Sequence, residues 1–268
     1  MTSAIEESDP IGGYLRDFGA GFENATDARA LDFSQTTPDA ARTAYFQRYL
    51  DEYYNAAFIY GQGTEYILAQ AARHAPGGHW LDIGSGTSTL FWATGFRGIK
   101  SVTCVDLVPE ALFVLDKFRA SDAVPACYGE ALDIAGNSAA ELARTRAVPW
   151  QYVQADVLRS WADHIAQQAY EMITAYAIFG IAPDLEGYKA CFRHLAAATR
   201  AGQVLLGADW IRSDDFVAFE SHDNRYVSVE ACRGAAAQAG LEVVECDYHA
   251  IKGDPLYSGV VAWVMRRK

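Results

Sequence analysis

The chain has 268 residues, 51% of them hydrophobic, which is enough for one large α/β domain with a full core. Its formal net charge is −12 and its longest basic run is Arg266-Arg267-Lys268, which argues against a nucleic-acid partner because such a partner requires a basic face. No apolar segment has the length of a membrane span, the N-terminus is acidic, and the five cysteines lack close pairs, so we expect a cytoplasmic protein with free thiols.

The first 45 residues are predicted to form a helical lid over the site. Gly12 and Gly13 interrupt any long helix, yet Tyr14 and Phe18 are too apolar for a free tail and need burial. Residues 38–75 then carry a long helical pattern. We therefore divide the chain into an N-terminal lid segment, 1–45, and an α/β domain, 46–268.

Short apolar runs alternate with helical patterns along the α/β domain. Such alternation predicts a doubly wound, mostly parallel, Rossmann-like sheet of seven strands with one antiparallel strand. A long connection, 121–149, is interpreted as an insertion that could form one wall of the site. The expected strands are 79–83, 102–106, 150–154, 171–176, 203–208, 241–249 and 260–266, and the expected helices are 87–96, 109–120, 185–199 and 229–239.

A glycine turn follows the first expected strand. The segment Leu81-Asp82-Ile83-Gly84-Ser85-Gly86 leads from an apolar run into a helical pattern. Glycines there can adopt backbone angles closed to other residues and let a ligand touch the main chain, while the helix directs its N–H groups at that ligand. An ordinary tight turn is the alternative interpretation.

The second expected strand favours a nucleoside ligand without a pyrophosphate. It ends in Asp106, about twenty residues after the turn, where a carboxylate can hold both ribose hydroxyls. The third glycine of a dinucleotide fingerprint is absent, because Ser88-Thr89 stands in its place. S-adenosylmethionine (SAM) is the commonest cofactor of this kind, and we expect it here.

At these residues the chain resembles the class I SAM-dependent methyltransferases, and within them the nicotinamide, phenylethanolamine and thioether methyltransferase group. The glycine turn is similar to the first motif of the class. Two further segments resemble the narrower group, namely Tyr49-Leu50-Asp51-Glu52-Tyr53-Tyr54 and Ala182-Pro183-Asp184-Leu185-Glu186-Gly187-Tyr188, as does the C-terminal run from Val229 to Arg266. The likeness covers roughly residues 45–268.

The resemblance implies roles for several residues. Tyr49 and Tyr54 would lie near the methionine carboxylate and the sulfonium, although helix packing is an equal alternative. Asp156 would contact the adenine amine, or cap a helix. Asp209 and Ser213 would bind a nitrogenous acceptor. Ala111 departs from the pattern, because the family has a polar ribose contact at that position.

Tyr176 ends the fourth expected strand, close to where the sulfonium should lie. Its ring could stabilise that cation through its π face, or it could be a core tyrosine. The expected catalytic residues are Tyr54, Tyr176 and Asp209. The expected cofactor-binding residues are Tyr49, Tyr54, Gly84, Ser85, Gly86, Ser88, Asp106, Leu107, Asp156, Val157 and Tyr176.

Three functions remain open from the sequence. The first is methyl transfer from SAM to a small molecule, most simply N-methylation of an amine. The second is cyclisation of SAM itself to azetidine-2-carboxylate with release of methylthioadenosine, and the third is SAM binding without catalysis. No metal site is expected, since the six histidines are scattered and no Cys-x-x-Cys occurs. The partner is a small molecule, and the protein could be a monomer or a homodimer.

Overall fold

The computed structural model describes residues 28–159, 165 and 170–267. In this part of the chain one mixed sheet has the order β1-β4-β3-β2-β5-β6-β8-β7. The strands β2 to β6 are parallel to one another, and β8 runs antiparallel between β6 and β7. The strands are β1 (Arg29–Ala30), β2 (Gly78–Ile83), β3 (Ile99–Asp106), β4 (Trp150–Gln154), β5 (Met172–Tyr176), β6 (Val204–Arg212), β7 (Leu241–Ala250) and β8 (Tyr257–Arg267).

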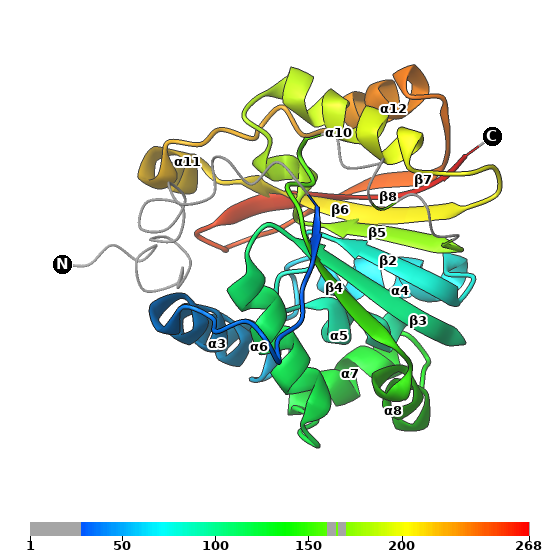
Figure 1. The fold of residues 1–268 in the computed structure, drawn as a ribbon. Helices are drawn as coiled ribbons and strands as arrows, with labels where there is room; N and C mark the ends of the chain where they lie inside the picture. Colours follow the sequence, from blue (N-terminus) through cyan, green and yellow to red (C-terminus); the bar gives the residue numbers. More distant parts are fainter. Residues whose placement is uncertain (1–27, 160–164, 166–169, 268) are drawn as a thin grey trace.

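Helices cover both faces of this sheet (Figure 1). One face carries α3 (Ala40–Tyr54), α4 (Thr64–His74), α5 (Thr89–Trp92), α6 (Pro109–Ala120), α7 (Ala126–Ile134) and α8 (Ala139–Ala147). The other carries α10 (Leu185–Ala197) and α12 (Val229–Gln238), while α11 (Asp214–Glu220) follows β6. Two short 3₁₀ turns, Ala93–Gly95 and Phe179–Ile181, complete the described elements. The predicted doubly wound sheet is confirmed, with the two-residue β1 added at its edge.

The helix boundaries follow from local sequence. Pro109 occupies the first turn of α6, where its missing N–H costs nothing. Asp184 and Ser228 cap α10 and α12 by accepting from backbone N–H groups of Gly187 and Ala231. The insertion 121–149 forms α7 and α8, so it is helical. None of the helices in the described ranges has the length and apolar character that a membrane crossing requires.

The predicted long helix over 38–75 is wrong, because it breaks between Tyr54 and Thr64 into α3 and α4. The break contains Gly61 and Gly63, both with positive φ. Gly63 also packs so closely on β8 that a Cβ there would clash with a methyl carbon of Val260. The N-terminal lid falls largely on residues 1–27, outside the described residues, and α3 crosses the expected boundary at 45.

Candidate cofactor and acceptor site

The turn after β2 has the geometry expected of a ligand-binding loop. Gly84 and Gly86 have φ values of 67° and 49°. A Cβ on Gly84 would meet the Ile178 side chain at 2.6 Å, whereas a Cβ on Gly86 would have no atom within 4 Å. Gly84 therefore serves close packing, and Gly86 leaves its main chain open to a ligand. Ser85 is buried, and its hydroxyl ties the turn together by donating to Asp82 O and accepting from Val105 N.

Asp106 faces this turn from the end of β3. Its Oδ2 accepts from the Gly86 N–H at 2.8 Å, and its Oδ1 accepts from the Val108 N–H at 2.9 Å. Burial raises the pKa of the carboxyl group, and these backbone donors act in the opposite direction. Each oxygen has a second lone pair, so the fixed carboxylate can still accept from both hydroxyls of a ribose.

Asp82, on β2 just before the turn, holds the turn in place through hydrogen bonds. Its two carboxylate oxygens accept from the hydroxyls of Thr174 and Thr89, both at 2.5 Å, and Trp80 Nε1 in turn donates to Thr174. Burial raises the pKa of Asp82 to about 7, although the hydroxyl donors oppose that shift. Asp82 thus connects β2, β5 and the first turn of α5, and it has no ligand-facing role.

The adenine-side candidates lie at the end of β4. Asp156 Oδ1 accepts from Leu158 N at 3.0 Å, and its Oδ2 pairs with Arg159 at 3.1 Å. The bond to Leu158 N closes a local turn, and the helix-cap alternative concerns residues 160–164, which lie outside the described residues. Val157 is buried, and Leu107 O accepts from the Gln154 amide. The polar groups at this edge are therefore held in place by local bonds.

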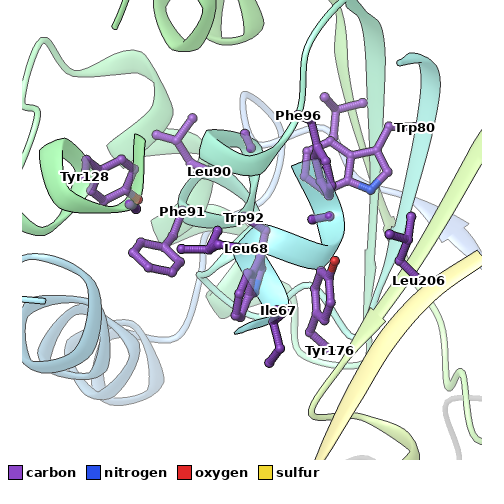
Figure 2. Close-up of a cluster of buried hydrophobic side chains, with 14 of the residues drawn as sticks. Ile67, Leu68, Trp80, Leu90, Phe91, Trp92, Phe96, Tyr128, Tyr176 and Leu206 are labelled. Carbon is purple, nitrogen blue, oxygen red and sulfur yellow. The ribbon is translucent and has the colours of Figure 1, made fainter. Parts of the chain in front are cut away.

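An aromatic cavity opens beside the glycine turn, with about 700 Å³ of empty space including its mouth. Rings from α3, α5, β6, β8 and the break between α3 and α4 surround it. Figure 2 shows Phe91 and Trp92 among the neighbouring core side chains. The lining residues are Tyr49, Tyr53, Tyr54, Phe58, Ile59, Gln62, Thr64, Phe91, Trp92, Cys127, Ala177, Trp210 and Tyr257.

Tyr49 and Tyr54 line this cavity. Their rings lie edge to face at 5.9 Å, and Tyr54 also packs against Phe91 at 5.2 Å. Burial raises the pKa of both hydroxyls, and the Tyr54 hydroxyl is hydrogen-bonded to the hydroxyls of Tyr49 and Ser88. Ser88 Oγ also accepts from Trp92 Nε1 at 3.1 Å. These bonds link the start of α5 to the wall of the cavity.

Tyr176 is buried at the end of β5. Its ring packs against Trp92, with centroids 4.4 Å apart (Figure 2). Tyr176 is not among the residues that line the aromatic cavity. The side chain is only 6% exposed, and no group in the described structure pairs with its hydroxyl. The strand β5 directs Tyr176 into the core, and Ala177, at φ 59°, is the residue that reaches the cavity. The structure thus corresponds to the core-tyrosine alternative.

Asp209 is fully buried on β6 and lines a second, smaller cavity. Its Oδ1 accepts from Gly180 N at 2.7 Å, and no described group makes a hydrogen bond of normal geometry to Oδ2. The second cavity shares Ala177, Trp210 and Tyr257 with the aromatic cavity. Asp209 is therefore a buried residue and not a charged residue of a surface loop. Its carboxylate lies next to the aromatic cavity rather than in it.

Ser213 has a structural role at the start of α11. Its hydroxyl accepts from Phe216 N at 3.0 Å as the cap of that helix and donates to Pro255 O at 2.6 Å. It lines neither cavity. His222, in the loop after α11, contacts Gly180 O through Nε2 at 3.3 Å, and burial lowers its pKa. In the described part of the chain, no cluster of three or more metal-ligating side chains occurs.

The buried Asp209 makes stability depend on pH. Burial raises its pKa from the ordinary 3.8 to about 7, so between these values the native state holds a proton that the unfolded chain releases. The free energy of unfolding is therefore expected to fall, by up to a few kcal/mol, as pH rises from about 4 to about 7. Asp209→Asn should reduce this dependence, measured by denaturant unfolding at pH 5 and pH 8. An unchanged difference between the two pH values would show that Asp209 does not bind this proton.

Several lining residues were missed by sequence reasoning. Phe58 and Gln62 lie in the break between α3 and α4, where a continuous helix was expected. Trp210 Nε1 donates to Gln62 O at 2.8 Å, and Gln62 Nε2 donates to Asp254 at 2.5 Å, so this break is bound to both β6 and the β7–β8 connection. The Gly61-Gln62-Gly63 sequence was the available signal for it.

Known proteins share the fold of this chain. No protein-family model matches the sequence, and no curated protein is significantly similar to it. Among solved structures, a chain from the complex of the Haloferax volcanii Trm112 methyltransferase activator with a methyltransferase superposes with a TM-score of 0.54 at 15% identity, covering 86% of this chain and 99% of that one.

Two further structures agree. A SAM-dependent methyltransferase from Clostridium acetobutylicum ATCC 824 gives a TM-score of 0.52 at 12% identity, over 84% of this chain and 98% of that one. The N-methyltransferase NodS from Bradyrhizobium japonicum WM9, solved with S-adenosylhomocysteine, gives 0.50 at 12%, over 76% and 85%. At such identities the likeness shows the fold alone, which is that of SAM-dependent methyltransferases. The narrower likeness to the nicotinamide methyltransferase group stays a prediction.

Proposed function

We propose that the protein is a SAM-dependent methyltransferase that methylates a small amine. One observation carries the proposal: the Asp106 carboxylate is bonded to Gly86 N at 2.8 Å, directly across the open glycine turn. A ribose diol requires a fixed carboxylate at this place, and a nucleoside requires the unobstructed main chain that Gly86 leaves. NodS, an N-methyltransferase of the same fold, was solved with S-adenosylhomocysteine.

The residues of this chain fit SAM at that turn. Its nucleoside would be held by Gly84, Gly86 and Asp106. The adenine would lie against the end of β4. SAM supplies an electrophilic methyl group on a sulfonium. The chain contributes positioning and exclusion of water: the aromatic cavity beside the turn would hold the acceptor in line with that methyl group. No covalent nucleophile is needed for a displacement of this type.

Mass spectrometry tests the proposal directly. The protein is incubated with methyl-deuterated SAM and a mixture of small amines, and products are compared with those from SAM alone. The proposal expects a deuterated methyl group on an amine and one S-adenosylhomocysteine per transfer, in the mixture only. Methylthioadenosine and azetidine-2-carboxylate formed together from SAM alone would instead indicate cyclisation, and SAM binding without any product would indicate a binding protein; either result would refute methyl transfer.

A further inference from the structure

The aromatic cavity has an unusual lining for an amine site. Eight of its thirteen lining residues are aromatic, and none of those in the described ranges carries a formal charge. A site for a protonated amine normally contains a carboxylate, but Asp209 lines the neighbouring smaller cavity and Asp254 accepts from the Gln62 amide instead of lining the aromatic cavity. The following inference rests on the proposed function and concerns which amines this cavity accepts.

The indole groups of the cavity offer ring faces rather than free donors. Trp92 Nε1 donates to Ser88 Oγ at 3.1 Å, and Trp210 Nε1 donates to Gln62 O at 2.8 Å. Both N–H groups are thus satisfied within the protein, while both side chains line the cavity. Aromatic faces attract organic cations, and indole attracts them most strongly. The net charge of −12 favours cationic ligands over anionic ones as well.

The described lining also lacks an effective proton acceptor. Burial raises the pKa of the Tyr49 and Tyr54 hydroxyls and raises the pKa of the Cys127 thiol to about 11, so these groups stay protonated at neutral pH. The side chains of Gln62 and Thr64 are not bases at neutral pH. The lining therefore offers no ionised acceptor for an N–H group. The ammonium product of a primary or secondary amine carries N–H groups that need such an acceptor, whereas a quaternary ammonium product carries none.

We propose that the acceptor is a compact tertiary amine and that the product is a quaternary ammonium ion. The nitrogen lone pair forms the new C–N bond, the S–CH₃ bond breaks, and its electron pair stays on sulfur. The acceptor reacts as the neutral amine, so no proton moves in this step, and the product has no N–H because its nitrogen carries four carbon substituents. The positive charge passes from sulfur to nitrogen inside the ring of aromatic side chains, which stabilises it in both places.

Binding measurements on protein saturated with S-adenosylhomocysteine test the cavity without turnover. The probes are choline and its neutral carbon isostere, 3,3-dimethylbutan-1-ol, which differ in charge but hardly in shape. We expect choline to bind at least tenfold more tightly by calorimetry. Equal affinities, or no measurable binding of choline, would overturn the inference.

Variants of Trp210 test whether the cavity is responsible for the preference for choline over its neutral isostere. Trp210→Leu should remove most of the preference for choline, and Trp210→Phe, which keeps a weaker π face and is less disruptive to folding, should retain part of it. The matched control is Tyr66→Leu, since Tyr66 is an exposed aromatic residue stacked on His249 outside the cavity. A preference that survives in Trp210→Leu would place the cation elsewhere and overturn the inference.

A matched series of acceptors then separates this inference from the proposed function. Dimethylaminoethanol, methylaminoethanol and ethanolamine differ only in the substitution of nitrogen. With SAM, the tertiary amine should be methylated at least tenfold faster than the other two. Faster methylation of the secondary or primary amine would overturn the inference and leave the proposed function intact, whereas absence of SAM binding by calorimetry would remove the proposed function itself.

Discussion

Asp106→Ala is expected to weaken SAM binding by about 2–3 kcal/mol, which is roughly 30- to 150-fold in Kd, because charge-assisted bonds to the ribose are lost. The same carboxylate fixes Gly86 N and Val108 N, so the substitution also loosens the turn that carries the nucleoside. Isothermal calorimetry with SAM and with S-adenosylhomocysteine measures the effect.

Two controls separate ribose binding from damage to the turn. Asp106→Asn keeps the shape of the side chain and one carbonyl oxygen, so it should retain part of the affinity. Glu245 lies on β7, where its carboxylate pairs with Arg73 and His74 of α4. Glu245→Ala should therefore leave SAM affinity unchanged. Wild-type affinity in a folded Asp106→Ala protein would mean that the nucleoside lies elsewhere.

Tyr176→Ala is expected to destabilise the protein by about 3–5 kcal/mol, because it opens a void behind Trp92 in a closely packed core. Tyr176→Phe should preserve or slightly raise stability, since it removes a buried hydroxyl that no described group pairs with. The rate of Tyr176→Phe should therefore stay close to wild type. Thermal unfolding and initial rates, measured on the same preparations, give both quantities.

The comparison of the two Tyr176 variants distinguishes a core residue from a reacting one. If the hydroxyl contacted the acceptor, Tyr176→Phe would lose rate at unchanged stability. If neither variant altered stability, the packing against Trp92 would have no energetic importance. Either result would contradict the position that the structure gives to this residue.

The sheet and the glycine turn were predictable because their signals are local. Apolar runs ending in Gly84 and in Asp106 place both residues at the carboxyl edge of parallel strands, whatever the helices do. Asp106 therefore faces the turn as expected. The hydroxyl of Ser213 could not be assigned from sequence, since whether it caps α11 or faces a ligand depends on the contact with Pro255.

The aromatic cavity was not predictable, because its walls meet only in the tertiary structure. A helical pattern runs through residues 55–63, but Gly63 packs on Val260 of β8 and the chain turns there instead. Likewise, sequence places Tyr176 at a strand end, and only the packing of Trp92 in front of it decides that the ring is core. Nonlocal contacts thus determine which aromatic residues reach the ligand.

The central claim is that the glycine turn and Asp106 hold the nucleoside so that its sulfur faces the aromatic cavity. A crystal structure of the protein with S-adenosylhomocysteine tests this most directly. The account predicts both ribose hydroxyls on the Asp106 carboxylate and the thioether sulfur directed into the cavity lined by Tyr54, Trp92 and Trp210. A nucleoside bound away from Asp106, or a sulfur directed away from that cavity, would contradict it.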